Sequence, residues 1–201
     1  SPGDVIDAMY DYGKCYDEPF ADSSALPSML LSKVARKHVK VALTGDGADE
    51  TFLGYNRYAV LEKLRHLYKI PLGVRKISRL VPEKFLSSKM KSGVRTLCLT
   101  DSSEFYHTYM QGFEQNYFGG DPRSFLTQHK DYLYATSNVL ANAGLYDTVT
   151  YLPDDINVKV DRASMFASLE LRAPFLDYRV VEYGISLPEK FKLYQGRKKI
   201  I

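Results

Sequence analysis

The spacing of apolar residues predicts a mainly helical chain with one clear strand. Residues 5–37 are expected to form helical segments around a loop at 17–22, and further helices are expected at 57–68, 74–80, 102–111, 123–134 and 138–148. Within the first region, residues 26–36 carry apolar side chains at helical spacing. The run from Val39 to Leu43 is short, contains β-branched residues and ends at a glycine-containing turn, which is typical of a strand. This order predicts the edge of an α/β sheet joined to an α-helical subdomain.

A longer helix is predicted over residues 152–171. A rotation of about 100° per residue places its apolar side chains in one stripe that should be buried. These residues are Leu152, Ile156, Val160, Ala163 and Ala167. Lys159 lies at the edge of the stripe, so this helix would direct its ammonium group along a packed interface. Asp161 and Arg162 point away from the centre of the stripe.

The last predicted helix follows Asp177 and ends before Pro188. Asp177 is suited to be its N-cap, and Leu176 and Val181 are spaced for a hydrophobic staple. We assign Arg172 and Asp177 to structure rather than to chemistry.

Composition limits the class of protein. Hydrophobic residues make up 45% and charged residues 25%, as in ordinary soluble domains. The net charge of +3 is too small to indicate nucleic-acid binding, and no apolar run approaches the ~20 residues that cross a bilayer. Cys15 and Cys98 lack the spacing of a metal site. We therefore expect a cytoplasmic protein with reduced thiols, without a nucleic-acid or membrane partner and without a zinc site of its own.

Both ends of the sequence are unusual for natural termini, which are commonly polar and frayed. The chain begins at Ser1 without an initiator Met and ends in the basic, apolar run 196–201. We expect it to be an internal piece of a longer protein.

The strongest candidate site is the turn after the predicted strand, which reads Thr44-Gly45-Asp46-Gly47-Ala48-Asp49-Glu50. In open α/β sheets, ligands bind beyond the carboxyl ends of the strands. Glycines let the backbone approach a ligand and expose N–H groups to it. The three carboxylates are suited to hold Mg²⁺ on a polyphosphate or to receive a substrate ammonium group.

This turn has two other interpretations. A structural one stays open, and a dinucleotide-binding one is disfavoured. Asp46 could be a helix N-cap with Asp49 answering it as in a capping box, which would make both residues structural. The Gly-x-Gly run also suggests a dinucleotide fingerprint, but Asp49 occupies the third glycine position, and three carboxylates would repel a pyrophosphate that no metal shields. No Gly-Lys-Ser/Thr phosphate loop is present.

Three blocks of the sequence resemble the glutamine-dependent asparagine synthetase family. The first is residues 44–50 with Gly54-Tyr55-Asn56-Arg57-Tyr58, the second is Leu152-Pro153-Asp154-Asp155 with residues 159–165, and the third is residues 169–177. They occur in the family's order, and the likeness is weaker from 65 to 151. The resemblance identifies residues 1–201 as part of one C-terminal synthetase domain.

The resemblance implies an α/β fold of the ATP-pyrophosphatase type, similar to the adenine nucleotide alpha-hydrolases, of which this piece is mainly helical with one or two parallel strands. It also implies the reaction. A glutaminase domain releases ammonia from glutamine, ATP adenylates the side chain of aspartate, and ammonia displaces AMP from the β-aspartyl-AMP intermediate. ATP and Mg²⁺ are the implied cofactors, with the metal held mainly through pyrophosphate and not by a protein site. A homodimer of the intact protein is compatible with the family.

The resemblance also assigns roles to residues. Thr44 and Gly45 would contact the nucleotide through backbone groups, and Asp46 would support the adenylation step. Asp49 and Glu50 would line the substrate and metal side.

Two more residues complete the implied site. Tyr55 would close the pocket, and Lys159 would supply positive charge to the pyrophosphate. Each has a structural alternative, because Tyr55 is equally suited to a core and Lys159 could pair with Asp155 one helical turn away.

The sequence departs from the family in several ways. Some relatives have Glu where this chain has Asp46, and Thr51 and Leu53 stand where an apolar and a small residue are expected. The Ser-Gly-Gly-x-Asp-Ser nucleotide loop and an N-terminal cysteine nucleophile do not occur in it. The mobile lysine loop of the family would lie beyond Ile201. We therefore expect this chain alone to be inactive.

Three functions stay open at this point. One is asparagine synthesis by the intact protein. The second is amidation of another carboxylate, on a sugar, a peptide or a β-lactam precursor. The third is a non-catalytic interaction module that kept the fold.

Overall fold

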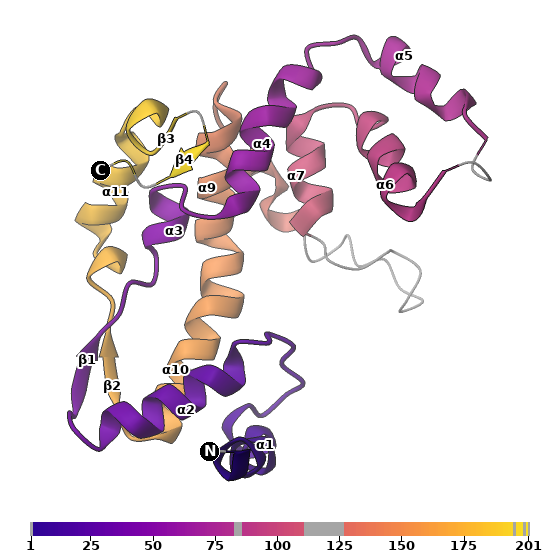
Figure 1. Cartoon of the computed structure of the whole chain (residues 1–201). Coiled ribbons are helices and arrows are strands. Elements are labelled where there is room, and N and C mark those ends of the chain that lie inside the picture. The colour runs from indigo at the N-terminus through magenta and orange to yellow at the C-terminus, as the bar shows by residue number, and fades with distance from the viewer. Residues whose placement is uncertain (1, 83–85, 111–126, 195, 199, 201) are drawn as a thin grey trace. The chain divides into compact units, whose positions relative to one another are not determined.

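The computed structural model describes residues 2–82, 86–110, 127–194, 196–198 and 200 (Figure 1). The chain divides into two compact units. Unit 1 comprises Ser1–Thr51 and Asp147–Ser186, and unit 2 comprises Phe52–Tyr146 and Leu187–Ile201. Unit 1 is therefore built from two stretches of sequence between which most of unit 2 is inserted.

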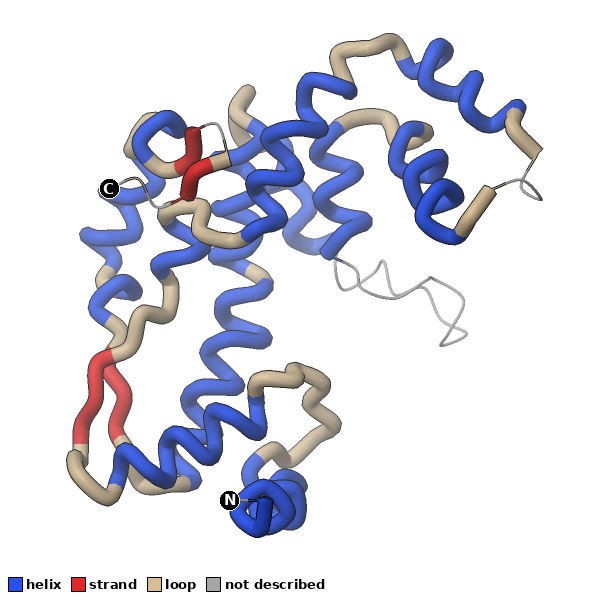
Figure 2. The backbone as a smooth tube through the Cα atoms, in the orientation of Figure 1, coloured by secondary structure: helices blue, strands red, loops and turns tan. Residues whose placement is uncertain are grey.

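Unit 1 is a small parallel sheet with helices. Its elements are α1 (Pro2–Cys15), α2 (Ala25–Arg36), β1 (Val41–Leu43), α3 (Ala48–Thr51), a π-helical turn η4 (Leu152–Asn157), α10 (Val158–Phe166), β2 (Glu170–Arg172), η5 (Pro174–Leu176) and α11 (Tyr178–Ser186). Strands β1 and β2 run side by side in parallel, as Figure 2 shows in red, with Ala42 opposite Leu171. Helix α10 packs against α2, and buried Ala25, Met29 and Ala163 lie in the core between the helices.

The first strand is shorter than the predicted run from Val39 to Leu43. It begins at Val41, because the amide of Val39 still donates to the carbonyl of Ala35 at the end of α2, at 3.0 Å. The strand ladder is continued by Thr44, whose N–H donates to the carbonyl of Arg172 at 2.9 Å.

The helix predicted over 152–171 ends early, and the prediction is wrong for its last five residues. Helix α10 stops at Phe166, and Ser168 then takes a left-handed conformation with φ of 57°. The N–H of Leu169 reaches back to the carbonyl of Ser164 at 2.9 Å, which closes the helix end in the manner of a Schellman motif. Glu170–Arg172 can then pair with β1, a partner that helical periodicity does not reveal.

The other predicted elements are largely confirmed. The predicted helices at 26–36, 57–68, 102–111 and 138–148 correspond to α2, α4 (Asn56–Leu67), α7 (Ser102–Met110) and α9 (Val139–Val149), and α9 continues from unit 2 into unit 1. Residue 111 and residues 123–126 of two predicted helices lie outside the described residues. Asp177 caps α11 as predicted, since its Oδ1 accepts from the N–H of Arg179 at 2.9 Å.

Several elements of unit 2 differ from the prediction. The segment 74–80 is divided between α5 (Leu72–Arg75) and the 3₁₀ helix η1 (Lys76–Leu80), and Thr127–Tyr134 forms a 3₁₀ helix, η3. Elements without a prediction are α6 (Ser88–Leu97), η6 (Glu189–Phe191) and the antiparallel pair β3 (Leu193–Tyr194) and β4 (Arg197–Lys198).

The core of unit 2 is rich in tyrosine. Tyr58, Tyr106 and Tyr146 are fully buried among leucines, with ring centroids 6.1 Å apart for the first pair and 6.4 Å for the second. The hydroxyl of Tyr106 accepts from Arg57 Nε at 2.9 Å, so this buried polar group has a partner.

The buried side chain of Arg75 also stabilises unit 2. It is 5% exposed, and its guanidinium donates at 2.7 to 2.9 Å to four backbone carbonyls, those of Ile70, Leu97, Leu99 and Thr100. Its guanidinium also lies 4.7 Å from the centroid of the Tyr68 ring. These contacts tie α5 to the segment that joins α6 and α7.

The chain is thus mainly helical with a small parallel sheet, as the sequence predicts. Among its described residues, no helix is both long enough and apolar enough to span a membrane.

Candidate functional site

The candidate site is formed where β1 ends and the chain turns into α3. Gly47 lies in this turn with φ of 86°, a conformation that side chains rarely adopt. A Cβ atom at this position would also overlap Cδ2 of Leu176 in η5. Both the positive φ and the close contact therefore require glycine at position 47, where the first and third of the sequence blocks meet.

Gly45 is in a different situation. It is exposed, and an added Cβ atom would meet nothing within 4 Å. The space beside the backbone of Gly45 is open, as a ligand approaching the main chain requires.

Thr44 and Asp46 lie between two cavities of unit 1. The first, which we call the lysine cavity, has a volume of about 490 Å³ and is also lined by Lys159 and by Leu31 and Ser32 of α2. The second, the arginine cavity, has a volume of about 700 Å³ and is also lined by Arg162. Lys159 and Asp46 therefore both line the lysine cavity.

Two polar side chains of this turn, those of Thr44 and Asp46, have no hydrogen-bond partner among the described residues. Thr44 Oγ1 is buried and makes no hydrogen bond to any residue that the structure describes. The carboxylate of Asp46 is half-buried, and within the described part of the chain no hydrogen bond or ion pair to it is found. A buried hydroxyl without a partner costs free energy, so a ligand that bonds to it would be favoured.

The remaining predicted residues lie elsewhere. Asp49 is half-buried and Glu50 is 2% exposed in α3, and neither is among the residues that line these two cavities. Tyr55 belongs to unit 2, where its ring centroid lies 3.9 Å from the guanidinium of Arg57. The roles assigned to Asp49, Glu50 and Tyr55 stay predictions.

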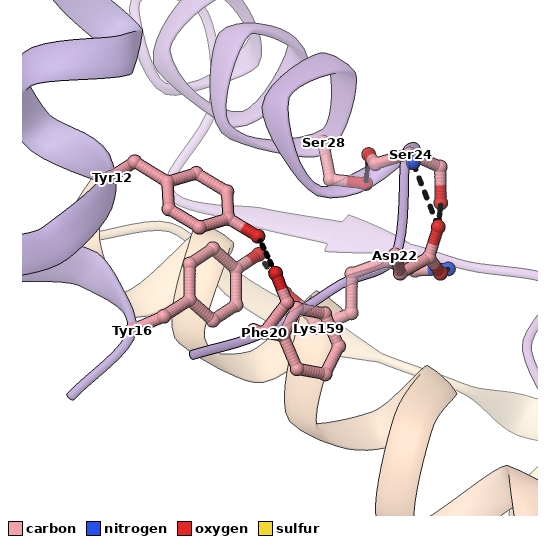
Figure 3. A network of polar contacts seen from close by, with 7 residues as sticks. All are labelled: Tyr12, Tyr16, Phe20, Asp22, Ser24, Ser28 and Lys159. Carbon is pink, nitrogen blue, oxygen red and sulfur yellow. Dashed lines mark hydrogen bonds and ion pairs between the residues drawn. The ribbon is translucent and has the colours of Figure 1, made fainter. Parts of the chain in front are cut away.

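Lys159 makes a buried ion pair that the sequence did not predict (Figure 3). Its Nζ lies 2.6 Å from Oδ2 of Asp22, and the two side chains are only 10% and 15% exposed. The suggested partner within the helix, Asp155, is not the one that Lys159 contacts. Asp22 lies in the loop between α1 and α2, 137 residues away in sequence.

The other oxygen of Asp22 is also occupied. Oδ1 accepts from both the N–H and the hydroxyl of Ser24, each at 2.7 Å. Burial alone would raise the pKa of Asp22, but the hydrogen bonds from Lys159 and Ser24 outweigh burial and hold that pKa below its ordinary value. Asp22 is therefore a carboxylate at neutral pH, with both oxygens bonded.

The loop that carries Asp22 is fixed by aromatic residues. The rings of Tyr16 and Phe20 stack with centroids 4.8 Å apart, and the hydroxyl of Tyr12 donates to the carbonyl of Phe20. The hydroxyl of Tyr16 donates to the carbonyl of Lys159 at 3.1 Å, and burial raises the pKa of Tyr16. The same tyrosine thus connects the loop to the backbone of α10 (Figure 3).

Two further ion pairs are more exposed. Asp17 of the same loop pairs with Arg162, and Arg172 pairs with Glu170 on β2 at 2.8 Å. The second pair agrees with the structural assignment of Arg172.

Comparison with known proteins identifies the family. The asparagine synthase family model matches residues 1–201, the whole chain. The chain belongs to the asparagine synthase family. Asparagine synthetase [glutamine-hydrolyzing] 1 of Bacillus subtilis (strain 168) is 31% identical over 197 residues, which cover 92% of this chain and 31% of that protein.

Other relatives agree. A putative asparagine synthetase [glutamine-hydrolyzing] of Mycobacterium bovis and one of Mycobacterium tuberculosis (strain ATCC 25618 / H37Rv) are each 35% identical over 199 residues, covering 91% of this chain and 29% of the relative. The chain therefore spans about a third of the length of the curated relatives that it matches. No solved structure matches it.

Proposed function

We propose that this chain is part of the synthetase domain of an ATP-dependent ligase that forms asparagine from aspartate and ammonia released from glutamine. The observation that carries the proposal is the meeting of Thr44, Asp46 and Lys159 at one cavity, beyond the carboxyl end of a parallel strand. The names of the relatives support the reaction. The proposed fold of the intact domain is the ATP-pyrophosphatase type of α/β fold, similar to the adenine nucleotide alpha-hydrolases.

The residues present fit a nucleotide. Thr44 offers a buried hydroxyl without a partner, and Gly45 leaves its backbone open to approach. In the proposal these two residues hold ATP, and Mg²⁺ is held mainly through the phosphate oxygens. Hard cations such as Mg²⁺ prefer oxygen ligands and commonly reach a protein through a substrate's phosphates.

Lys159 supplies the positive charge. When the aspartate carboxylate attacks the α-phosphorus of ATP, the bond to the departing pyrophosphate breaks and negative charge develops on the pyrophosphate. A cation that is already in place stabilises that charge without reorganisation. Lys159 lies in the wall of the lysine cavity and fits this role.

Asp46 supplies a carboxylate on the same wall. After adenylation, ammonia attacks the acyl carbon of β-aspartyl-AMP, AMP leaves, and the nitrogen loses a proton. A carboxylate within hydrogen-bond reach of that nitrogen can accept the proton. The resemblance implies Glu in place of Asp46 in part of the family, so the identity of the proton-accepting acid is the part of this proposal that most needs a test.

The proposal includes partners outside this chain. A glutaminase domain would supply ammonia, and the Ser-Gly-Gly-x-Asp-Ser loop, absent from these residues, would grip pyrophosphate. The 201-residue chain alone should then make no asparagine, since each lost donor to a transition state costs a few kcal/mol.

The test is an assay of the intact protein that contains this chain. Pyrophosphate release and amide formation would be measured with ATP, Mg²⁺ and glutamine or ammonium, with aspartate beside sugar, peptide and β-lactam precursor acids. Aspartate should give the highest kcat/KM. Turnover of another acid but not of aspartate would favour the alternative amidation, and turnover of none would favour a non-catalytic module.

Lys159→Met tests the residue that carries the charge. Loss of one transition-state donor should lower kcat/KM for ATP by about 10²-fold or more. Lys63→Met, on the exposed side of α4, is the matched control and should leave kcat/KM unchanged.

A further inference from the structure

We propose that Asp22 is a positioning residue for Lys159, which holds the ammonium group at the cavity wall and keeps it from pairing with Asp46. The inference rests on the proposed function, because Asp22 can position Lys159 for pyrophosphate only if Lys159 has the role proposed above. None of the sequence blocks that carry the family resemblance includes Asp22.

The contact geometry gives the ammonium group one fixed position. Nζ of Lys159 is 2.6 Å from Oδ2 of Asp22, while Oδ1 is held by two hydrogen bonds from Ser24. The carboxylate therefore cannot rotate without breaking all three contacts. A lysine has a flexible stem with several rotatable bonds, and a fixed carboxylate reduces the orientations that it adopts.

The backbone around the pair is fixed as well. Tyr16 donates to the carbonyl of Lys159 and stacks on Phe20, two residues before Asp22. The position of the carboxylate relative to α10 is thus set by Tyr16, the buried residue that follows α1. Preorganised groups of this kind act at an active site without the cost of reorganisation during the reaction.

The cavity holds a competing carboxylate. Asp46 lines the same lysine cavity, and its side chain makes no ion pair within the described part of the chain. A buried ammonium group without a counter-ion is strongly disfavoured. Without the charge of Asp22, Lys159 would turn to Asp46, and the two groups that the reaction uses separately would neutralise each other.

Asp22→Asn in the intact enzyme tests the inference, because the amide keeps the shape and removes the charge. We expect the inhibition constant for inorganic pyrophosphate to rise and kcat/KM for ATP to fall, each by about tenfold or more. In a Lys159→Met background the same change should add less than about twofold, since coupled residues are not additive. Asp22→Glu should recover part of the loss.

Asp17→Asn is the matched control. It removes the other carboxylate of the same loop, whose side chain is 73% exposed and pairs with Arg162. Pyrophosphate inhibition should stay at the wild-type value in this variant. Folded enzyme would be quantified by thermal unfolding and rates normalised to it, so that lost stability is not counted as lost binding.

The outcomes separate the two proposals. If Lys159→Met leaves pyrophosphate inhibition unchanged, the role of Lys159 in the proposed function is wrong. If Lys159→Met weakens it but Asp22→Asn does not, only the positioning role of Asp22 is wrong. If Asp22→Asn does not fold, Ser24→Ala is used instead, because it removes one bond from Oδ1 and keeps the ion pair. An unchanged inhibition constant in Ser24→Ala would then overturn the inference, and a rise of about twofold would support it.

Discussion

Lys159 of unit 1 and Arg75 of unit 2 are both buried cations, and they are satisfied in different ways. In unit 1, Lys159 is 8% exposed and meets the carboxylate of Asp22 at the wall of a cavity. In unit 2, Arg75 is 5% exposed and donates to four backbone carbonyls. A rigid guanidinium with five donors suits several fixed acceptors, whereas an ammonium group is a compact charge on a mobile stem.

The difference separates a cation that holds the fold from one that is available to a ligand. The carbonyls around Arg75 belong to the main chain, so moving the guanidinium would leave several acceptors without a donor. Lys159 has one side-chain partner and open space beside it, so a phosphate can share its charge. Burial of a cation therefore says little about function until its partners are known.

The largest effect on stability should come from Arg75. Arg75→Met keeps most of the stem but removes every donor, and we expect the free energy of unfolding to fall by about 3 kcal/mol, because several carbonyls lose a charged partner. Urea unfolding would measure the loss, and faster amide exchange in 70–100 would locate it. Arg79→Met, an exposed neighbour, is the control; equal stability of the two variants would remove the contrast between the units.

Within unit 1, the same contrast between packed and open space can be tested at two glycines. Gly47→Ala should lower the free energy of unfolding by about 2–3 kcal/mol, because the new Cβ meets Leu176 and φ is positive. Gly45→Ala meets no atom, so its effect should stay below about 1 kcal/mol. Thermal unfolding of both variants gives the comparison, and a larger loss for Gly45→Ala would contradict the described turn.

Acid should weaken the Lys159 contact and spare the Arg75 contacts. The pKa of Asp22 is lower in the folded state than its ordinary value of 3.8 in the unfolded state. The ionised carboxylate therefore stabilises the fold fully above about pH 3.8. This stabilisation is lost as the pH falls through the pKa of the folded state. The carbonyls around Arg75 do not titrate. The stability difference between wild type and Asp22→Asn should therefore shrink below pH 3.8, whereas that between wild type and Arg75→Met should not. Urea unfolding from pH 2 to 7 would show parallel curves if this assignment is wrong.

The smallest effect is expected at Ser168. This residue has φ of 57° at the end of α10, where glycine carries no steric cost. Ser168→Gly should raise the free energy of unfolding by about 0.5 kcal/mol, as relief of the strained conformation exceeds the added freedom of the unfolded chain. A loss of stability in thermal unfolding would show that the serine side chain contributes more than its conformation costs.

Local signals predicted the elements that depend on local sequence. The strand at Val41–Leu43 and the turn at Thr44–Glu50 follow from β-branched residues and glycines, and the helical wheel placed Lys159 beside the packed face. What was missed depends on distant partners. Residues 167–171 continue a helical pattern, and only pairing with β1, together with the left-handed Ser168, makes part of them a strand.

The role of Asp22 at the site could not be predicted from the sequence either, because it also depends on a distant partner. Its loop was recognised from the sequence, but nothing local distinguishes Asp22 from Asp17, since both are acids in one loop. The tertiary fold alone decides that one is buried against Lys159 and the other is exposed. The sequence blocks predicted residues that line the cavity, such as Asp46 and Lys159, whereas Asp22, the counter-ion of Lys159, is identified only by the three-dimensional structure.

The discontinuous construction of unit 1 has a consequence for synthesis in the cell. Asp22 and its partner lie 137 residues apart, so at translation rates of about 5–20 residues per second the N-terminal half of the unit waits on the order of ten seconds for its complement. During that interval α2 has no α10 to cover Met29, and β1 does not yet have β2 as its neighbour. An uncovered apolar helix face and a bare strand edge are surfaces that chaperones bind and that promote aggregation. The nascent chain should depend on a holding chaperone from the emergence of β1 until β2 leaves the ribosome.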